Sequence, residues 1–239
     1  MPRFYVDTAL RAGSSITLPE DSAHHAVHVL RIRTGDEVTL FNGRGGEYAA
    51  RVASIERLKV VVDLLEHRAI ERESPLRMVL VQGVSAGERM DFTIRKAVEL
   101  GAAEIHPVLS ASSVARPKGE RAAARHAHWQ KIAIAACEQC GRNRIPPVRP
   151  LVVAADYRPE GAGTRILLAP DAQFRFSQAC KGGEDFTIAA GPEAGFSAEE
   201  GARFADAGFV PARLGTRVLR TETAGIAALA ALSALRGDF

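Results

Sequence analysis

The feature that most constrains the fold of this chain is a regular alternation of short apolar runs and helical segments that begins near Leu76. Runs with the length and composition of buried strands cover residues 78–84, 105–109, 165–169, 186–190 and 209–214. Helical patterns cover residues 88–100, 121–140 and 221–235, and a further helix is expected to begin at residue 197. Such alternation predicts an α/β domain with a largely parallel sheet.

Residues that begin and end helices support these boundaries. Gly101 and Gly141 each follow a helical pattern, at the position where glycine readily adopts the left-handed conformation that ends a helix. Ser197 and the glutamate three residues later have the spacing of a capping box. Thr221 is expected to cap the last helix, with Glu222 placed favourably near its positive end.

The first 70 residues have a different, mostly β pattern. Two extended runs, 36–41 and 47–52, flank the glycine-rich segment 43–46, which predicts a hairpin. A third strand is expected at 58–65 and a short helix at 21–30.

Several short strands with one helix in this length favour a small barrel. The charged segment 66–75 is expected to be a linker. We therefore divide the chain into a β domain, residues 1–70, and an α/β domain, residues 71–239.

Composition narrows the class of protein further. Apolar residues make up 46% and charged residues 25% of the chain, as is usual for a globular protein. No apolar run approaches the roughly 18–20 residues that a membrane-spanning helix needs, so we expect no membrane partner. Residues 1–7 lack the apolar core of a signal peptide, and the three cysteines do not suggest a disulfide framework. The expected location is the cytoplasm.

Positive charge is concentrated in one segment. Residues 114–149 contain eight Arg or Lys residues and two acids, a net charge of +6, whereas the whole chain carries only +3. A basic stripe of this kind is typical where phosphates bind, but a solvated helix face would look the same.

Two segments could form a ligand pocket. Gly191–Phe196 follows an apolar strand, and its two glycines would let a ligand approach the backbone, although a tight turn alone could also require them. In Leu214–Ala224, helix capping accounts for a threonine and a glutamate. It does not account for Gly215, Arg217 and Arg220 in the same loop, which suggest a site for an anionic group.

Possible metal motifs are weak. Cys137 and Cys140 lie one helical turn apart, but no second pair completes a zinc site, so core packing is favoured. His24 and His28 have similar spacing and no convincing carboxylate beside them, so we expect no metal. The segment that follows the cysteines, Gly141–Arg144, is a better functional candidate because guanidinium groups suit phosphates and base edges.

Taken together, these segments resemble the RsmE family of the SPOUT methyltransferase superfamily. The matching pieces occur in family order over nearly the whole chain: 1–5, 24–25 with 29–31, 87–91, 96–101, 138–146, 191–196 and 214–224. Two positions depart from the family pattern. Ala194 replaces a glycine, which should stiffen the loop, and Ala86 stands where a lysine is common.

The resemblance implies an N-terminal PUA-like β-barrel that binds RNA, and a C-terminal SPOUT α/β domain with a trefoil knot. It implies S-adenosyl-L-methionine as cofactor, and 16S rRNA of the small ribosomal subunit as partner, methylated at N3 of a specific uridine. It also implies a homodimer with active sites near its interface and no need for a metal.

The resemblance also implies roles for individual residues. The cofactor is expected to contact Leu168, Ala169, Pro170, Gly191, Pro192, Glu193, Gly195, Leu214, Gly215, Leu219, Arg220 and Thr221. The expected catalytic residues are Arg144, Arg220 and Glu222. The expected RNA-binding residues are Arg3, His25, Arg31, Arg89, Arg142, Asn143 and Arg144.

Two other functions would fit the same residues. A non-catalytic RNA-binding assembly factor could keep the fold without turnover. An unrelated protein could use residues 191–195 to bind a nucleotide phosphate, and it would then prefer ATP or GTP to S-adenosylmethionine.

Overall fold

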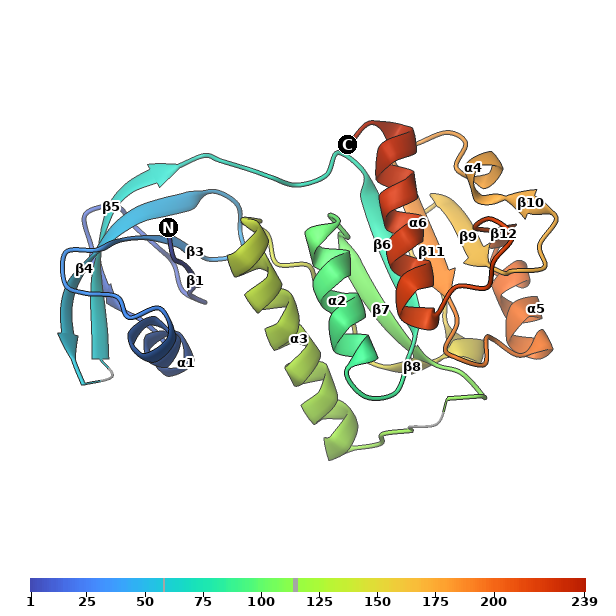
Figure 1. The fold of residues 1–239 in the computed structure, drawn as a ribbon, viewed down its shortest axis with the longest axis horizontal. Helices are drawn as coiled ribbons and strands as arrows, with labels where there is room; N and C mark the ends of the chain where they lie inside the picture. The colour runs from blue at the N-terminus through green and yellow to red at the C-terminus, as the bar shows by residue number, and fades with distance from the viewer. Residues whose placement is uncertain (58, 114–115) are drawn as a thin grey trace. The chain divides into compact units, whose positions relative to one another are not determined.

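The computed structural model describes residues 1–57, 59–113 and 116–239 (Figure 1). Residue contacts divide the chain into two compact units. Unit 1 comprises residues 1–73 and 137–145, and unit 2 comprises residues 74–136 and 146–239. The division expected from the sequence has one boundary, near residue 70, whereas in the structure residues 137–145 also group with the first unit.

Unit 1 is built on a five-stranded sheet in the order β1-β3-β4-β5-β2. Its strands are β1 (Arg3–Tyr5), β2 (Ser15–Thr17), β3 (Glu37–Phe41), β4 (Glu47–Glu56) and β5 (Lys59–Arg68). β1 pairs with β3 in parallel, and the other pairs are antiparallel. Inward-facing side chains such as Val38, Val52 and Val62 form a buried apolar core.

The hairpin expected between β3 and β4 is confirmed. Gly43, Gly45 and Gly46 all have positive φ there, which side chains rarely adopt. The linker expected from residue 66 is wrong at its start, because β5 continues to Arg68 in register with β4. Leu58, the first residue of the expected third strand, lies outside the described residues.

The helix expected at 21–30 is present, but it changes type midway. An α-helix, α1 (Glu20–His24), continues as a π-helical turn, η1 (His25–Val29). The turn ends with Arg31 in the left-handed region at φ 54°. Residues 24, 25, 28, 29, 30 and 31 are all exposed.

Unit 2 is built on a seven-stranded sheet in the order β10-β12-β9-β11-β6-β7-β8. All of its pairs are parallel, as the alternation predicted. The strands are β6 (Arg77–Gly83), β7 (Glu104–Leu109), β8 (Val152–Val153), β9 (Thr164–Leu168), β10 (Phe174–Arg175), β11 (Asp185–Ala190) and β12 (Val210–Arg213).

Helices connect and cover this sheet. They are α2 (Arg89–Glu99), α3 (Glu120–Cys140), η2 (Ala154–Asp156), α4 (Phe176–Ala179), α5 (Ala198–Asp206) and α6 (Thr221–Arg236). The last four residues of α3 belong to unit 1. α2 and α6 pack side by side (Figure 1). The capping box at Ser197 and Glu200 is confirmed, and Gly101 and Gly141 have the positive φ expected after a helix. No helix in the described part of the chain is long and apolar enough to span a membrane.

Candidate functional site

A cavity of about 760 Å³ lies in unit 2 where β9, β11 and β12 end and α6 begins. Ligands of parallel α/β proteins bind at the carboxyl ends of the strands, and this volume suits a small organic molecule. Most of the wall comes from the three segments that follow these strands. The lining residues are Arg89, 167–171, 191–196, Gly201, Ala212, Leu214, 217–222 and Ala224.

The loop after β11 exposes backbone because it folds closely on itself. Gly195 has φ +72° and donates its N–H to the carbonyl of Pro192 at 2.8 Å. A Cβ atom added to Gly191 would lie 3.0 Å from the Cα of Gly195. Ala194 is not among the described non-glycine residues with positive φ, so alanine fits there without strain.

The end of β6 packs closely against this loop. A Cβ atom added to Gly83 would lie only 2.4 Å from the backbone nitrogen of Pro192, so only glycine allows this approach. Gly83 was not among the site residues expected from the sequence. A glycine inside an apolar strand is a signal of close backbone approach and could have identified it.

The first turn of α6 forms another wall. The N-cap is Arg220, and its side chain makes no capping hydrogen bond. The expected cap, Thr221, is therefore wrong: its hydroxyl donates to the carbonyl of Gly191 at 2.7 Å and accepts from Gln82 Nε2 at 3.1 Å. Arg220, Thr221 and Glu222 all line the cavity, so the positive end of the helix dipole lies beside it.

An ion pair marks the rim of the cavity. Glu193 accepts from the guanidinium of Arg89 at 2.6 Å and from the N–H of Ala86 at 3.2 Å. Burial raises the pKa of Glu193, but hydrogen bonds from backbone N–H groups and Arg89 outweigh it and lower the pKa overall. Glu193 is therefore ionised at neutral pH and holds Arg89, an expected RNA-binding residue, against the loop after β11.

A buried carboxylate joins two further loops. Glu200 is only 3% exposed and accepts from Ser110 Oγ at 2.8 Å and from the N–H groups of Ala111 and Ser197 at 2.7 and 2.8 Å. Ser112 Oγ in turn donates to the carbonyl of Gly195 at 2.9 Å. These contacts hold the segment after β7 against the cavity loop, and they were not expected from the sequence.

The structure brings together nearly the whole expected cofactor set. Of those residues all except Gly215 line the cavity, as do the expected catalytic residues Arg220 and Glu222. Lining residues that belong to none of the expected cofactor, catalytic and RNA-binding sets are Leu167, Asp171, Ala194, Phe196, Gly201, Ala212, Arg217, Val218 and Ala224. The third expected catalytic residue, Arg144, belongs to unit 1.

Three of the expected RNA-binding residues are held inside unit 1. Arg3 donates to Glu47 at 2.5 Å and to Asn143 Oδ1 at 2.7 Å, and Asn143 is fully buried. Arg142 is 5% exposed and pairs with Glu73 at 2.5 Å. Burial raises the pKa of Glu47, but its bonds to Arg3 and Arg72 outweigh it and lower the pKa overall. These contacts make Arg3, Arg142 and Asn143 structural groups of unit 1.

The other expected RNA-binding residues are accessible. His25, Arg31, Arg89 and Arg144 are exposed, and Arg144 makes only a loose ion pair with Glu71 at 3.7 Å.

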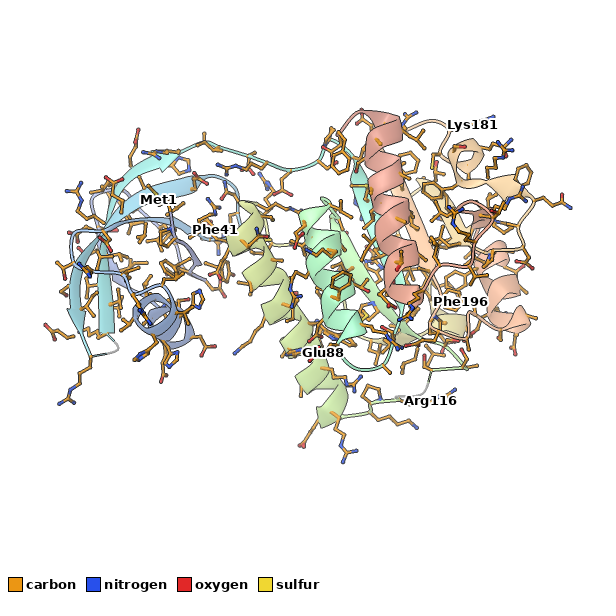
Figure 2. The ribbon with its side chains drawn as sticks, in the orientation of Figure 1. Met1, Phe41, Glu88, Arg116, Lys181 and Phe196 are labelled. Carbon is orange, nitrogen blue, oxygen red and sulfur yellow. The ribbon has the colours of Figure 1, made fainter. Side chains whose placement is uncertain are left out.

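The basic stripe divides in the structure. Arg116, Lys118, Arg121 and Arg125 surround a surface hollow of about 820 Å³ where α3 begins. Figure 2 labels Arg116 in this part of the chain. None of the four forms an ion pair among the described residues, whereas Arg149 pairs with Glu104 at 2.7 Å. Residues 114 and 115 of the stripe lie outside the described residues.

In the described part of the chain, no three His, Cys, Asp or Glu side chains gather into a possible metal site. Cys137 is buried, and burial raises the pKa of its thiol to about 12. Cys137 therefore packs in the core as the sequence favoured, whereas Cys140 is only partly buried.

Known proteins resemble the chain over its full length. A family model of the RNA methyltransferase domain matches residues 72–233, and a model of the RNA methyltransferase PUA domain matches residues 18–65. Ribosomal RNA small subunit methyltransferase E of Buchnera aphidicola subsp. Schizaphis graminum is 32% identical, covering 100% of this chain and 98% of that protein. The Bacillus subtilis protein of the same name is 28% identical over 100% of both chains.

Solved structures show the same full-length similarity. Ribosomal RNA small subunit methyltransferase E from Neisseria gonorrhoeae, bound to S-adenosylmethionine, matches with TM-score 0.92 and 38% identity over 100% of this chain and 99% of that one. A Legionella pneumophila methyltransferase in complex with the same cofactor matches with TM-score 0.92 and 36% identity over 97% and 96% of the two chains.

The mixed sheet of unit 1 and the parallel sheet with its cavity in unit 2 are therefore the two domains of an RNA methyltransferase with a PUA domain. Within that class, the chain belongs to the ribosomal RNA small subunit methyltransferase E family. The resemblance found in the sequence is confirmed.

Proposed function

We propose that this protein transfers a methyl group from S-adenosylmethionine to N3 of a specific uridine in 16S rRNA of the small ribosomal subunit. The observation that carries the proposal is the cavity at the ends of β9, β11 and β12. It belongs to a chain 38% identical to a family member solved with this cofactor.

The cavity fits this cofactor chemically. Its wall contains backbone from three loops, where N–H and C=O groups can recognise an adenine edge, beside apolar side chains such as Leu168, Leu214 and Leu219. The remaining expected contacts, Ala169, Pro170, Pro192 and Gly215, belong to the same loops. We propose these residues, with Gly191, Glu193, Gly195, Arg220 and Thr221, as the cofactor site.

S-adenosylmethionine supplies an electrophilic methyl group on a sulfonium. In the proposed transfer a bond forms between that carbon and uracil N3, the carbon–sulfur bond breaks with its electron pair remaining on sulfur, and N3 loses its proton. We assign Arg220 to stabilise the negative charge that develops on the flanking carbonyl oxygens. It lines the cavity and has no ion-pair partner among the described residues. Glu222, half-buried beside it, would accept or orient the proton.

RNA would be held by exposed basic side chains. His25 begins the π-helical turn of unit 1, Arg31 follows the end of that turn, and Arg89 lies at the cavity rim. The basic hollow at residues 116–125 would contact phosphates. Arg3, Arg142 and Asn143 would act indirectly, by holding unit 1 together.

The family resemblance supports four further parts of the proposal. The C-terminal part of the SPOUT domain is knotted, the β sheet of unit 1 closes as a PUA-like barrel, and the protein works in the cytoplasm. It also forms a homodimer in which Arg144 of one subunit completes the site of the other.

Calorimetry tests the function directly. We expect wild-type protein to bind S-adenosylmethionine and S-adenosylhomocysteine but not ATP. Binding of ATP alone would identify a nucleotide-phosphate protein. Cofactor binding without methylation of any RNA would identify a non-catalytic binding factor.

Subunit exchange tests the shared site. Arg144→Ala and Gly195→Val proteins, each of low activity alone at limiting cofactor, should regain part of their methylation activity when mixed and allowed to exchange subunits. No recovery after verified exchange, or an active monomer, would contradict the shared site while leaving the cofactor assignment intact.

A further inference from the structure

A fully buried amide lies directly behind the cavity wall. Gln82, near the end of β6, is 0% exposed and does not line the cavity. Its Nε2 donates to the carbonyl of Gly83 and to Thr221 Oγ1, both at 3.1 Å. Thr221 and its other partner, Gly191, do line the cavity.

The donor and acceptor groups of Gln82, Thr221 and Gly191 determine the direction of each hydrogen bond between them. A backbone carbonyl can only accept, so the nitrogen of the Gln82 amide must face Gly83. The same nitrogen then donates to Thr221, whose oxygen must accept. The single hydroxyl proton of Thr221 is left for the carbonyl of Gly191, at 2.7 Å.

If Gln82 served only to fill space, it would stabilise the protein less than an apolar side chain of the same size. Its Oε1 is buried with no hydrogen-bond partner among the described residues, which costs stability. The adjacent helix makes room for it with a glycine: a Cβ atom added to Gly225 would lie 3.0 Å from this oxygen. A methionine would fill the same space without an unsatisfied acceptor, so the donor of Gln82 must be what the site requires.

We propose that Gln82 is a positioning residue that fixes the cofactor site through Thr221. The relay from Gln82 through Thr221 to Gly191 joins the end of β6, the first turn of α6 and the loop after β11. It thereby sets the distance between the exposed backbone of that loop and Arg220 and Glu222. This inference rests on the proposed function, because it takes the cavity to be the S-adenosylmethionine site.

The test compares variants along the relay by calorimetry with S-adenosylmethionine, alongside thermal unfolding. Gln82→Met should weaken cofactor binding about fivefold to tenfold, the loss expected for one buried hydrogen bond. Thr221→Val should weaken it at least as much, and Thr221→Ser, which keeps the hydroxyl, should stay within about twofold of wild type. Ser233→Ala is the matched control, a buried hydroxyl further along α6 whose oxygen contacts Met78 Sδ only at 3.9 Å.

The double variant separates a relay from simple packing. Because Gln82 acts through Thr221, Gln82→Met with Thr221→Val should bind no more weakly than Thr221→Val alone. Additive losses, or a folded Gln82→Met protein that binds within twofold of wild type, would overturn the inference. If Gln82→Met does not fold, equal binding by Thr221→Val and Thr221→Ser would overturn it. Failure of the wild-type protein to bind S-adenosylmethionine would instead overturn the proposed function.

Discussion

Gly195 offers a sharp test of the cofactor loop, because its matched control lies in the same unit. Gly195 has φ +72°, and a Cβ atom added there would meet nothing within 4 Å. Gly182, in the exposed loop before β11, has φ +76° and equally empty surroundings. The two glycines lie at opposite ends of β11, and only Gly195 lines the cavity.

Valine at either position must adopt the left-handed region, which costs roughly 1–2 kcal/mol. The net loss of stability is smaller by about 0.4–1 kcal/mol, because valine also reduces the conformational freedom of the unfolded chain. Both variants should therefore fold with similar, modest losses of stability. In Gly195→Val the loop can relieve the strain only by moving backbone that lines the cavity, so a cost of about 1.4 kcal/mol would appear as tenfold weaker binding.

Calorimetry with S-adenosylmethionine and thermal unfolding should be measured on both variants. We expect Gly195→Val to bind about tenfold more weakly than wild type, and Gly182→Val to bind like wild type. Equal affinity in the two folded variants would refute the assignment of this loop to the cofactor.

Three further predictions follow from the charged groups. The double variant Arg121→Ala/Arg125→Ala should weaken RNA binding and reduce the slope of log affinity against log salt concentration by about two. The control double variant Lys181→Ala/Arg203→Ala should leave both unchanged. Equal salt slopes in the two double variants would show that the hollow is only a solvated face. Arg142→Ala should lower the thermal midpoint by about 10 °C because Glu73 loses its buried partner, and Arg144→Ala should lower it by less than about 3 °C; equal shifts would contradict the structural role of Arg142. Burial raises the pKa of Glu200, but its hydrogen bonds outweigh this effect and lower the pKa overall. Glu200 therefore stabilises the protein above the pKa that it has in the unfolded chain. This stabilisation is lost as the pH falls through its lower pKa in the folded protein. Glu200→Gln should therefore be less stable at pH 7 and lose less stability than wild type between about pH 5 and 3, which urea titrations at each pH would measure.

The sequence predicted the elements that are long enough to have a periodic pattern. The strands and helices of unit 2 that position the cavity lie close to their expected residues, and the glycines and capping box mark their ends. Strands β1, β2, β8 and β10 were missed because two or three residues cannot establish a period.

Glycines after two apolar strands indicated a pocket or a tight turn, and the family resemblance implied which residues contact the cofactor. The side chains that support these loops could not be predicted. Gln82 and Glu200 act through partners far along the chain, and no local pattern distinguishes a buried polar side chain from an exposed one. The same reason explains the different environments of Arg142 and Arg144. Both belong to one polar segment, yet Arg142 is buried and pairs with Glu73, which lies 69 residues away in the sequence.

The most direct test of the whole account is nucleoside mass spectrometry of 16S rRNA and small ribosomal subunits that lack the modification. After incubation with wild-type protein and S-adenosylmethionine, we expect one new 3-methyluridine, formed only when the cofactor is present and reduced with the Gly195→Val protein at limiting cofactor. A methyl group on another atom or base, or no methylated nucleoside with either substrate despite measurable cofactor binding, would contradict it.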